Sequence, residues 1–73
     1  MMVVSSNAWP AGYEVWRISR RLFSVLFNGG SVGVVRLHRS GTFHPTCSDK
    51  QLPERKVRDK AIMDVIEAHR KAG

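Results

Sequence analysis

The sequence predicts an α+β fold: a small antiparallel β-meander of three or four strands, with one C-terminal amphipathic helix packed on the sheet. Two observations favour the meander. Runs of β-branched and aromatic residues alternate with turn signals, and Asn28-Gly29 between two apolar runs is a strong hairpin signal. The helix is predicted because apolar residues recur at helical spacing toward the C-terminus.

The chain has 73 residues, of which 42% are hydrophobic, so it is large enough for one small domain with a folded core. Residues 1–12 are expected to be a mobile N-terminal segment, because chain ends usually are and "MMVVSSNA" shows no periodicity. Residues 13–73 form the single domain: a sheet over about 13–46, a connector at 47–53 and a helix over about 54–71.

The first strand follows the turn "WPAG" and is expected in "YEVWRI", which is rich in β-branched and aromatic residues. We expect at least one of the two tryptophans in the core, and Trp16 is the better candidate because strand residues flank it. Trp9 precedes a proline in the predicted mobile segment. It is therefore a candidate exposed anchor for a partner.

The hairpin between Arg21 and Arg39 has two possible turn centres. With Asn28-Gly29 at the centre, Phe23 lies opposite Val34 and Val25 opposite Val32. With Gly29-Gly30 at the centre, Phe27 lies opposite Val32 and Val25 opposite Val34. Either register places one apolar set on one face and a second set on the other, because a shift of two residues keeps the faces. The first set is Phe23, Val25, Val32 and Val34, and the second is Leu22, Leu26, Val35 and Leu37.

A turn at Ser40-Gly41 leads to a short third element, Thr42 to His44, which Pro45 ends. Pro53 suits the first turn of the helix, where its missing N–H would be unsatisfied anyway. The expected apolar stripe is Val57, Ala61, Ile62, Val65, Ile66 and Ala68. Two i, i+4 ion pairs, Glu54–Arg58 and Glu67–Lys71, are expected to support the outer surface of the helix.

The net charge is +6, and its distribution is uneven. Residues 1–46 contain five arginines, no lysine and one acidic residue, Glu14, which gives +4. Residues 47–73 contain seven basic and five acidic residues, which gives +2, interleaved along the helix. Arginine offers a planar fork for carboxylate or phosphate, so we predict a partner-binding patch on the sheet. The alternative is that these arginines only solvate strand ends. The candidate binding residues are Arg17, Arg20, Arg21, Arg36, Arg39 and Trp9.

Other groups of residues are only weak evidence for a metal site, a catalytic site or a phosphate-binding loop. His38, His44 and Cys47 provide only one cysteine, whereas a structural zinc site needs four ligands with paired spacings. Cys47 with His44 has no glycine-rich oxyanion element beside it. "NGGSVG" lies between two strands and lacks the lysine and helix of a phosphate-binding loop. We therefore expect no catalytic residue, no metal and no cofactor, and no enzymatic activity.

Cysteine usage and hydropathy bear on the compartment. The single cysteine cannot form an internal disulfide, and "MMVV" is too short for a signal sequence. No apolar run approaches the roughly 20 residues that span a bilayer. We expect a cytoplasmic protein with no membrane contact.

The basic meander ending in "PERKVRDKAIMDVIEAHRKAG" resembles the small RNA-polymerase-binding transcription regulators encoded by a Xanthomonas phage. The resemblance covers the whole chain, rests on length, charge and this ending, and transfers no site residue. It implies a non-enzymatic protein in the host cytoplasm that binds the large subunits of bacterial RNA polymerase. It also implies inhibition of initiation by displacement of the sigma factor, and an effect on termination.

The alternative is direct nucleic-acid binding. The arm-binding domains of phage integrases combine a three-stranded sheet with one helix and insert the sheet into the major groove. Arg17, Arg20, Arg36 and Arg39 would then contact phosphates or bases. Against this interpretation, aromatic and basic residues do not interleave along the sequence as they do in single-strand binders.

Overall fold

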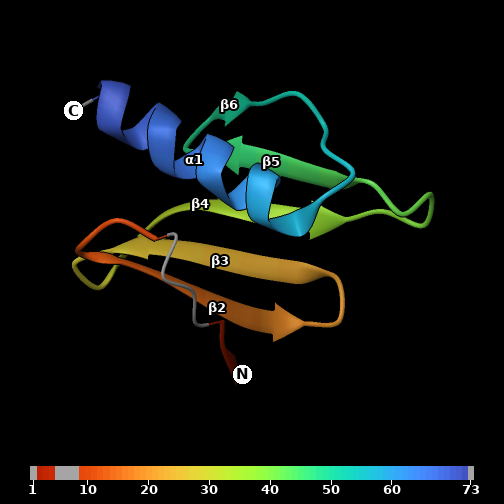
Figure 1. The fold of residues 1–73 in the computed structure, drawn as a ribbon, viewed down its shortest axis with the longest axis horizontal. Coiled ribbons are helices and arrows are strands. Elements are labelled where there is room, and N and C mark those ends of the chain that lie inside the picture. The colour runs from red at the N-terminus through yellow and green to blue at the C-terminus, as the bar shows by residue number, and fades with distance from the viewer. Residues whose placement is uncertain (1, 5–8, 73) are drawn as a thin grey trace.

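The computed structural model describes residues 2–4 and 9–72, and these form six strands and one helix (Figure 1). The elements, in chain order, are β1 (Met2–Val3), β2 (Tyr13–Ser19), β3 (Leu22–Phe27), β4 (Gly30–Leu37), β5 (Phe43–Cys47), β6 (Lys50–Gln51) and α1 (Arg58–Ala72). The described residues include no helix with the length and apolar character needed to cross a membrane.

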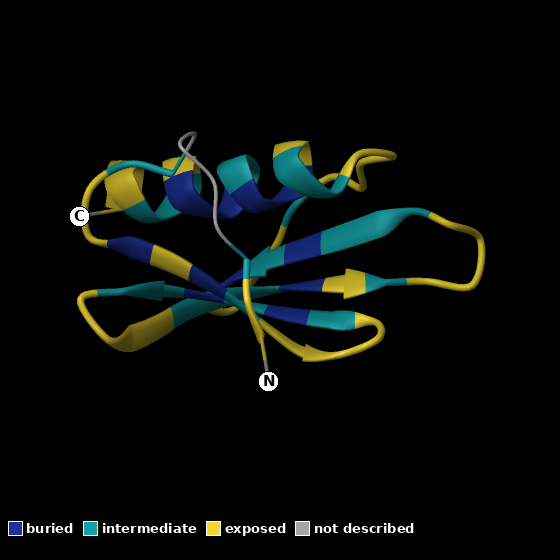
Figure 2. Cartoon of the chain, turned by 60° about the horizontal axis from the view of Figure 1, so that its bottom comes forward, coloured by how far each residue is buried: buried dark blue, intermediate teal, exposed yellow. Residues whose placement is uncertain are grey.

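The strands form one antiparallel sheet in the order β1-β2-β3-β4-β5-β6, so each strand lies beside its neighbours in sequence. Helix α1 lies across one face of this sheet, and no other element of the described residues covers the opposite face (Figure 2). The predicted α+β class and the packing of the helix on the sheet are confirmed. The predicted number of strands is wrong, because β1 and β6 are edge strands of only two residues each and leave no periodic pattern in the sequence.

The N-terminal residues extend the sheet beyond its predicted start. Met2 pairs with Arg17 and Val3 with Trp16, and the Val4 N–H donates to the Val15 carbonyl at 2.8 Å. The sheet therefore includes part of the segment that was placed outside the domain. Residues 5–8 of that predicted mobile segment lie outside the described residues.

The hairpin turn between β3 and β4 is Asn28–Gly29, as predicted, with φ angles of 50° and 87°. The predicted pairings are wrong, however, for both turn centres. Val25 lies opposite Gly33 and Phe23 opposite Val35, because the register shifts between Val25 and Leu26 and leaves Val32 as an extra residue. A one-residue bulge moves every later side chain of the strand to the other face.

The bulge decides which valine enters the core. Val35 is fully buried against the helix, whereas Val34 pairs with Ser24 on the uncovered face. The predicted sharing of one face by Phe23, Val25, Val32 and Val34 therefore fails at Val34. In the predicted second set, Val35 and Leu37 both follow the bulge and change sides, and Val35 joins the core.

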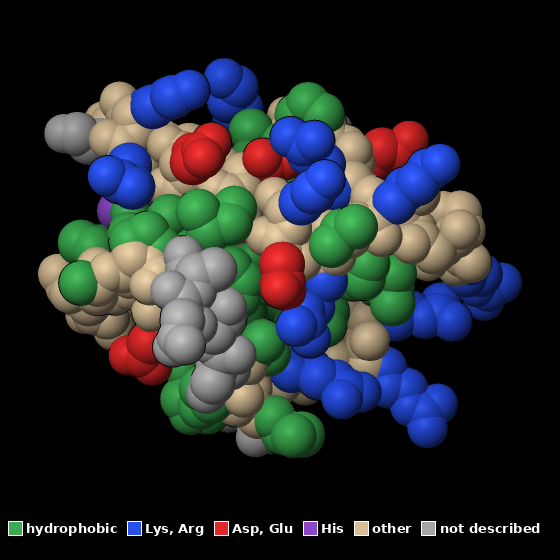
Figure 3. Space-filling view, in the orientation of Figure 1, with side chains coloured by type: hydrophobic (Ala, Val, Ile, Leu, Met, Phe, Trp, Pro, Cys, Tyr) green, Lys and Arg blue, Asp and Glu red, His purple; other side chains and the backbone are tan. Residues whose placement is uncertain are grey.

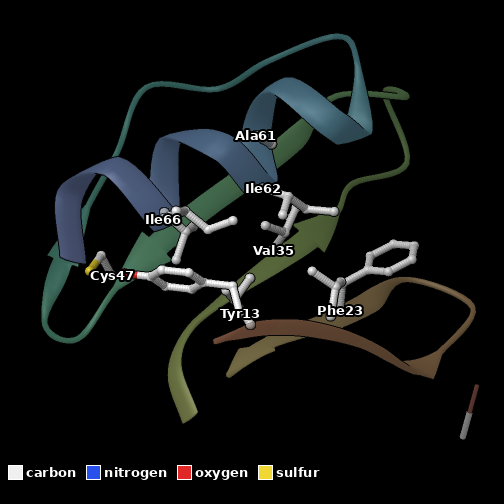
Figure 4. Close-up of a cluster of buried hydrophobic side chains, with 10 residues drawn as sticks. Tyr13, Phe23, Val35, Cys47, Ala61, Ile62 and Ile66 are labelled. Carbon is white, nitrogen blue, oxygen red and sulfur yellow. The ribbon is translucent and has the colours of Figure 1, made fainter. Parts of the chain in front are cut away.

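The core lies between α1 and strands β2 to β5 (Figure 4). Its buried members are Tyr13, Val15, Phe23, Val25, Val35, Cys47, Ala61, Ile62, Val65 and Ile66. Helix α1 comes close to β4 at Gly33, where an added Cβ would lie 2.5 Å from Val65 Cγ1. The absence of a side chain at this position allows the helix to pack directly on the strand backbone.

Strand β5 continues through Pro45, which was predicted to end it. Both backbone groups of Phe43 bond with Arg55, and the Pro45 carbonyl accepts from the Leu52 N–H at 2.9 Å. In an antiparallel strand, Pro45 has the same orientation as Phe43, so its missing N–H faces this short edge segment and not β4. Thr46 and Cys47 also belong to β5, and a turn at Ser48 leads to β6, so much of the predicted connector is a hairpin.

Helix α1 begins at Arg58, later than the predicted residue 54, because the preceding backbone pairs with the sheet at Arg55. Pro53 and Glu54 therefore precede the helix. The predicted i, i+4 ion pair of Glu54 with Arg58 assumed that both residues are helical, so it does not apply. Val57, predicted in the stripe, is 50% exposed and precedes the helix. The rest of the stripe is confirmed: Ala61, Ile62, Val65 and Ile66 are buried, and Ala68 packs against them.

Candidate partner-binding surface

All five predicted arginines lie at one end of the sheet. Arg20 and Arg21 form the turn between β2 and β3, and Arg39 lies in the turn between β4 and β5. These turns adjoin, since the Leu37 N–H donates to the Arg21 carbonyl at 2.8 Å. Arg17 and Arg36 are close to the same end in β2 and β4. We call this group the arginine end: Arg17, Arg20, Arg21, Arg36 and Arg39.

Figure 3 shows Lys and Arg side chains gathered at the right of the molecule, where both turns lie in Figure 1. The members of the arginine end are all exposed. Arg36 lies opposite Leu22 and His44, on the face away from α1. Arg17 lies opposite Phe23, on the helix side, where the Arg58 guanidinium is 6.0 Å from the Phe23 ring centre. Positive groups therefore surround this end from both faces.

The arginine end has no carboxylate partner among residues 2–4 and 9–72. The ion pairs there are Arg55–Asp64, Arg58–Asp59 and His44–Glu54. The contrast with Arg55 is clear: hydrogen bonding and charge attraction from Asp64 raise the pKa of Arg55 above its ordinary value. Arg17 only donates to the Ser19 carbonyl, at 3.3 Å. The forks of the arginine end are thus available to carboxylates or phosphates of another molecule.

Trp9 is not part of this group. The turn that follows it meets the opposite end of the sheet, where the Asn28 N–H donates to the Gly12 carbonyl at 2.9 Å. Trp9 itself packs against the core, and its indole N–H donates to the Val4 carbonyl at 3.0 Å. Trp9 is therefore half-buried and not freely exposed, and its contact with a partner stays a prediction.

Trp16 takes the position that was expected for Trp9. Its neighbour Val15 is fully buried, so Trp16 points to the other side of the strand, away from α1. There it is half-buried, and its indole N–H donates to the Glu14 carboxylate at 3.1 Å. The predicted core role of Trp16 is wrong. The alternation of Tyr13, Glu14 and Val15, with Tyr13 and Val15 inward, is the signal that places the next residue, Trp16, on the outer side.

Around Trp16 the uncovered face of the sheet is apolar. The predicted second apolar set includes Leu22 and Leu26 of this surface, but not Val3, Trp16 or Val34. Trp16 and Val34 lie on either side of Ser24, while Leu22 and Leu26 precede and follow Ser24 on β3. Val3 pairs with Trp16 and is 51% exposed. We call this surface the outer face and its apolar members the outer patch: Val3, Trp16, Leu22, Leu26 and Val34.

Two histidines stack at the basic end of the outer face. The ring centres of His38 and His44 are 3.6 Å apart, and His44 Nε2 lies 3.0 Å from Thr42 Oγ1 and 3.3 Å from Glu54 Oε2. Cys47, by contrast, is buried on the helix side of β5, so it does not meet His44. The described residues contain no group of three or more His, Cys, Asp or Glu side chains suited to a metal ion.

A concavity of about 900 Å³ lies between the second half of α1 and the segment from Cys47 to Arg55. Its lining is mixed: Leu52 and Ala68 are apolar, while the Arg55–Asp64 ion pair lies at its edge. No residue of the arginine end lines it, so it is separate from the predicted binding residues.

Comparison with protein-family models, with curated proteins and with solved structures finds no match to this chain.

Proposed function

We propose that this chain is a non-enzymatic, phage-type transcription regulator that binds the large subunits of a host bacterial RNA polymerase. Binding inhibits initiation, and the proposal includes an effect on termination. The observation that supports binding is the arginine end, which gathers five exposed guanidinium groups without a carboxylate partner among the described residues. The identity of the partner comes from the sequence resemblance.

A protein partner fits the surroundings of the arginine end better than duplex DNA does. Insertion of the sheet into a major groove would bring the outer face against phosphates and polar base edges. That face carries Leu22, Leu26 and Val34, and Glu14 beside Trp16 would repel phosphates. A guanidinium forms two parallel hydrogen bonds with a carboxylate or a phosphate alike, so the apolar outer face is what favours a protein partner.

The test exchanges arginine for lysine at four positions: Arg20, Arg21, Arg36 and Arg39. Charge is retained but the planar fork is lost. We expect affinity for purified bacterial RNA polymerase core enzyme, measured by biolayer interferometry, to fall by about tenfold or more. Inhibition of promoter-dependent transcription should fall in parallel.

The matched control changes the four lysines to arginine: Lys50, Lys56, Lys60 and Lys71. This exchange also alters four basic side chains, but none belongs to the arginine end, so affinity should stay within about threefold. A salt titration identifies the partner class: four phosphate contacts imply a slope of roughly −3.6, and a protein interface with an apolar centre gives a shallower one. Absence of polymerase binding, or tight binding to one DNA sequence with a steep slope, would overturn the proposal.

A further inference from the structure

The outer patch is an apolar surface that nothing in the described chain covers. Helix α1 packs on the opposite face of the sheet, and the outer face carries no element (Figure 2). Its members lie close together, because Trp16, Ser24 and Val34 are neighbours across three strands and Leu22 and Leu26 flank Ser24. A contiguous apolar patch of this kind on a small protein is typical of an interaction site.

The charged residues around the outer patch differ between its two ends along the strands. At one end, Arg36 lies opposite Leu22 and next to the turns that carry Arg20, Arg21 and Arg39. At the other end, Glu14 lies opposite Leu26. The outer face is thus apolar at its centre and strongly positive at one end, with negative charge at Glu14 and at the Glu54 carboxylate beside His44.

We propose that the outer face docks an amphipathic, acidic protein segment. Apolar side chains of the segment cover the outer patch, and its carboxylates lie over Arg36 and the neighbouring turns. This proposal rests on the proposed function in taking the partner to be a protein, and it names the surface and the chemistry of the bound segment. An apolar centre with tryptophan and arginine beside it matches the composition of protein–protein interfaces.

Charge favours this occupant over a second copy of the chain. Two molecules with a net charge of +6 each repel one another, whereas an acidic segment is attracted by the same field. Single-stranded nucleic acid fits less well. Its bases need aromatic platforms, and Trp16 is accompanied by Leu22, Leu26 and Val34 with the Glu14 carboxylate bound to its indole.

The fluorescence of Trp16 can report binding to the outer patch, because the chain has only two tryptophans. Trp9→Phe leaves Trp16 as the single tryptophan in the full chain. The probe is a synthetic helical peptide with leucine on one face and glutamate and aspartate on the other. We expect saturable binding with a blue shift of Trp16 emission, and no shift with the same peptide carrying lysine in place of the acids. Calorimetry with the unaltered chain should give the same affinity within about threefold.

Ser24 offers a matched pair of variants at the centre of the patch. Its side chain points away from the core, so both Ser24→Glu and Ser24→Gln should fold, which circular dichroism checks. Glutamine has the size of glutamate without its charge. We expect Ser24→Gln to weaken peptide binding by a few-fold, and Ser24→Glu to weaken it by about tenfold or more, through repulsion and a buried charge.

The same two variants are measured against RNA polymerase core enzyme, which separates this inference from the proposed function. Peptide binding that depends on Ser24 supports the inference even if polymerase does not bind. If Ser24→Glu leaves the affinity for RNA polymerase unchanged and the acidic peptide does not bind, the inference is overturned. The proposed function then still stands. Equal binding of the lysine peptide, a concentration-dependent dimer by light scattering, or a blue shift only with a single-stranded oligonucleotide would also overturn it.

Discussion

Replacement of Gly33 by alanine tests the contact between α1 and the sheet. Gly33 lies in β4 opposite Val25 and Cys47, directly beneath the helix. An added Cβ would lie 2.5 Å from Val65 Cγ1 and closer still to the Thr46 carbonyl oxygen. Carbon atoms in contact normally lie about 3.5 to 4.0 Å apart, so the helix would have to move by about 1 Å or more.

The expected cost is at the upper end of the range for overpacked cores, about 3 kcal/mol. A chain of this length has a free energy of unfolding on the order of 4 to 11 kcal/mol, so the loss is a large part of the total. At about 4 to 8 °C per kcal/mol, the melting temperature should fall by roughly 12 to 24 °C. Thermal unfolding followed by circular dichroism measures this.

Gly30→Ala is the matched control in the same strand. Its added Cβ would meet only the Phe27 carbonyl oxygen, at an ordinary 3.7 Å, so the change should stay within about 0.5 kcal/mol. The double variant Gly33→Ala with Val65→Ala should lose less stability than the sum of the two single changes, because the second removes one of the clashing atoms. Equal melting of Gly33→Ala and Gly30→Ala would refute the close packing of α1 on β4.

The remaining predictions address the turn, the core and one partly buried hydrogen bond. Gly29→Val should destabilise by more than about 1 kcal/mol, because φ is 87° and a β-branched residue resists it, and an unchanged melting temperature would contradict this. Val65→Asp should abolish the folded circular dichroism signal by burying an unpaired charge, whereas Lys60→Glu on the exposed side of α1 should retain it. Tyr13→Phe removes the hydroxyl that lies 2.6 Å from His69 Nδ1 and should cost about 1 kcal/mol in urea unfolding; no loss would show that solvent replaces this bond.

Local sequence is sufficient to predict the features that depend on neighbouring residues. Asn28-Gly29 forms the hairpin turn because these two residues adopt positive φ with little strain. Ala61, Ile62, Val65 and Ile66 form the buried side of the helix because their spacing alone places them on one stripe.

The gathering of the arginines also follows from chain order, although the sequence analysis did not use it. Turns of an antiparallel meander alternate between its two ends, so the turn at Arg20–Arg21 and the next turn but one, at Arg39, share an end. The positions of Trp9 and Trp16 were harder to predict from the sequence. Trp16 was recoverable from alternation, but nothing in the local sequence shows that Trp9 packs on the core.

Long-range contacts, and not local sequence, set which residues of β4 face the helix. The bulge at Val32 adds one residue to one strand, and this single unpaired residue exchanges the faces of Val34 and Val35. The start of α1 was decided in the same way, because pairing of Arg55 with Phe43 engages backbone groups that a longer helix would have used. Both outcomes depend on hydrogen bonds between residues distant in the sequence, so local preferences could not determine them.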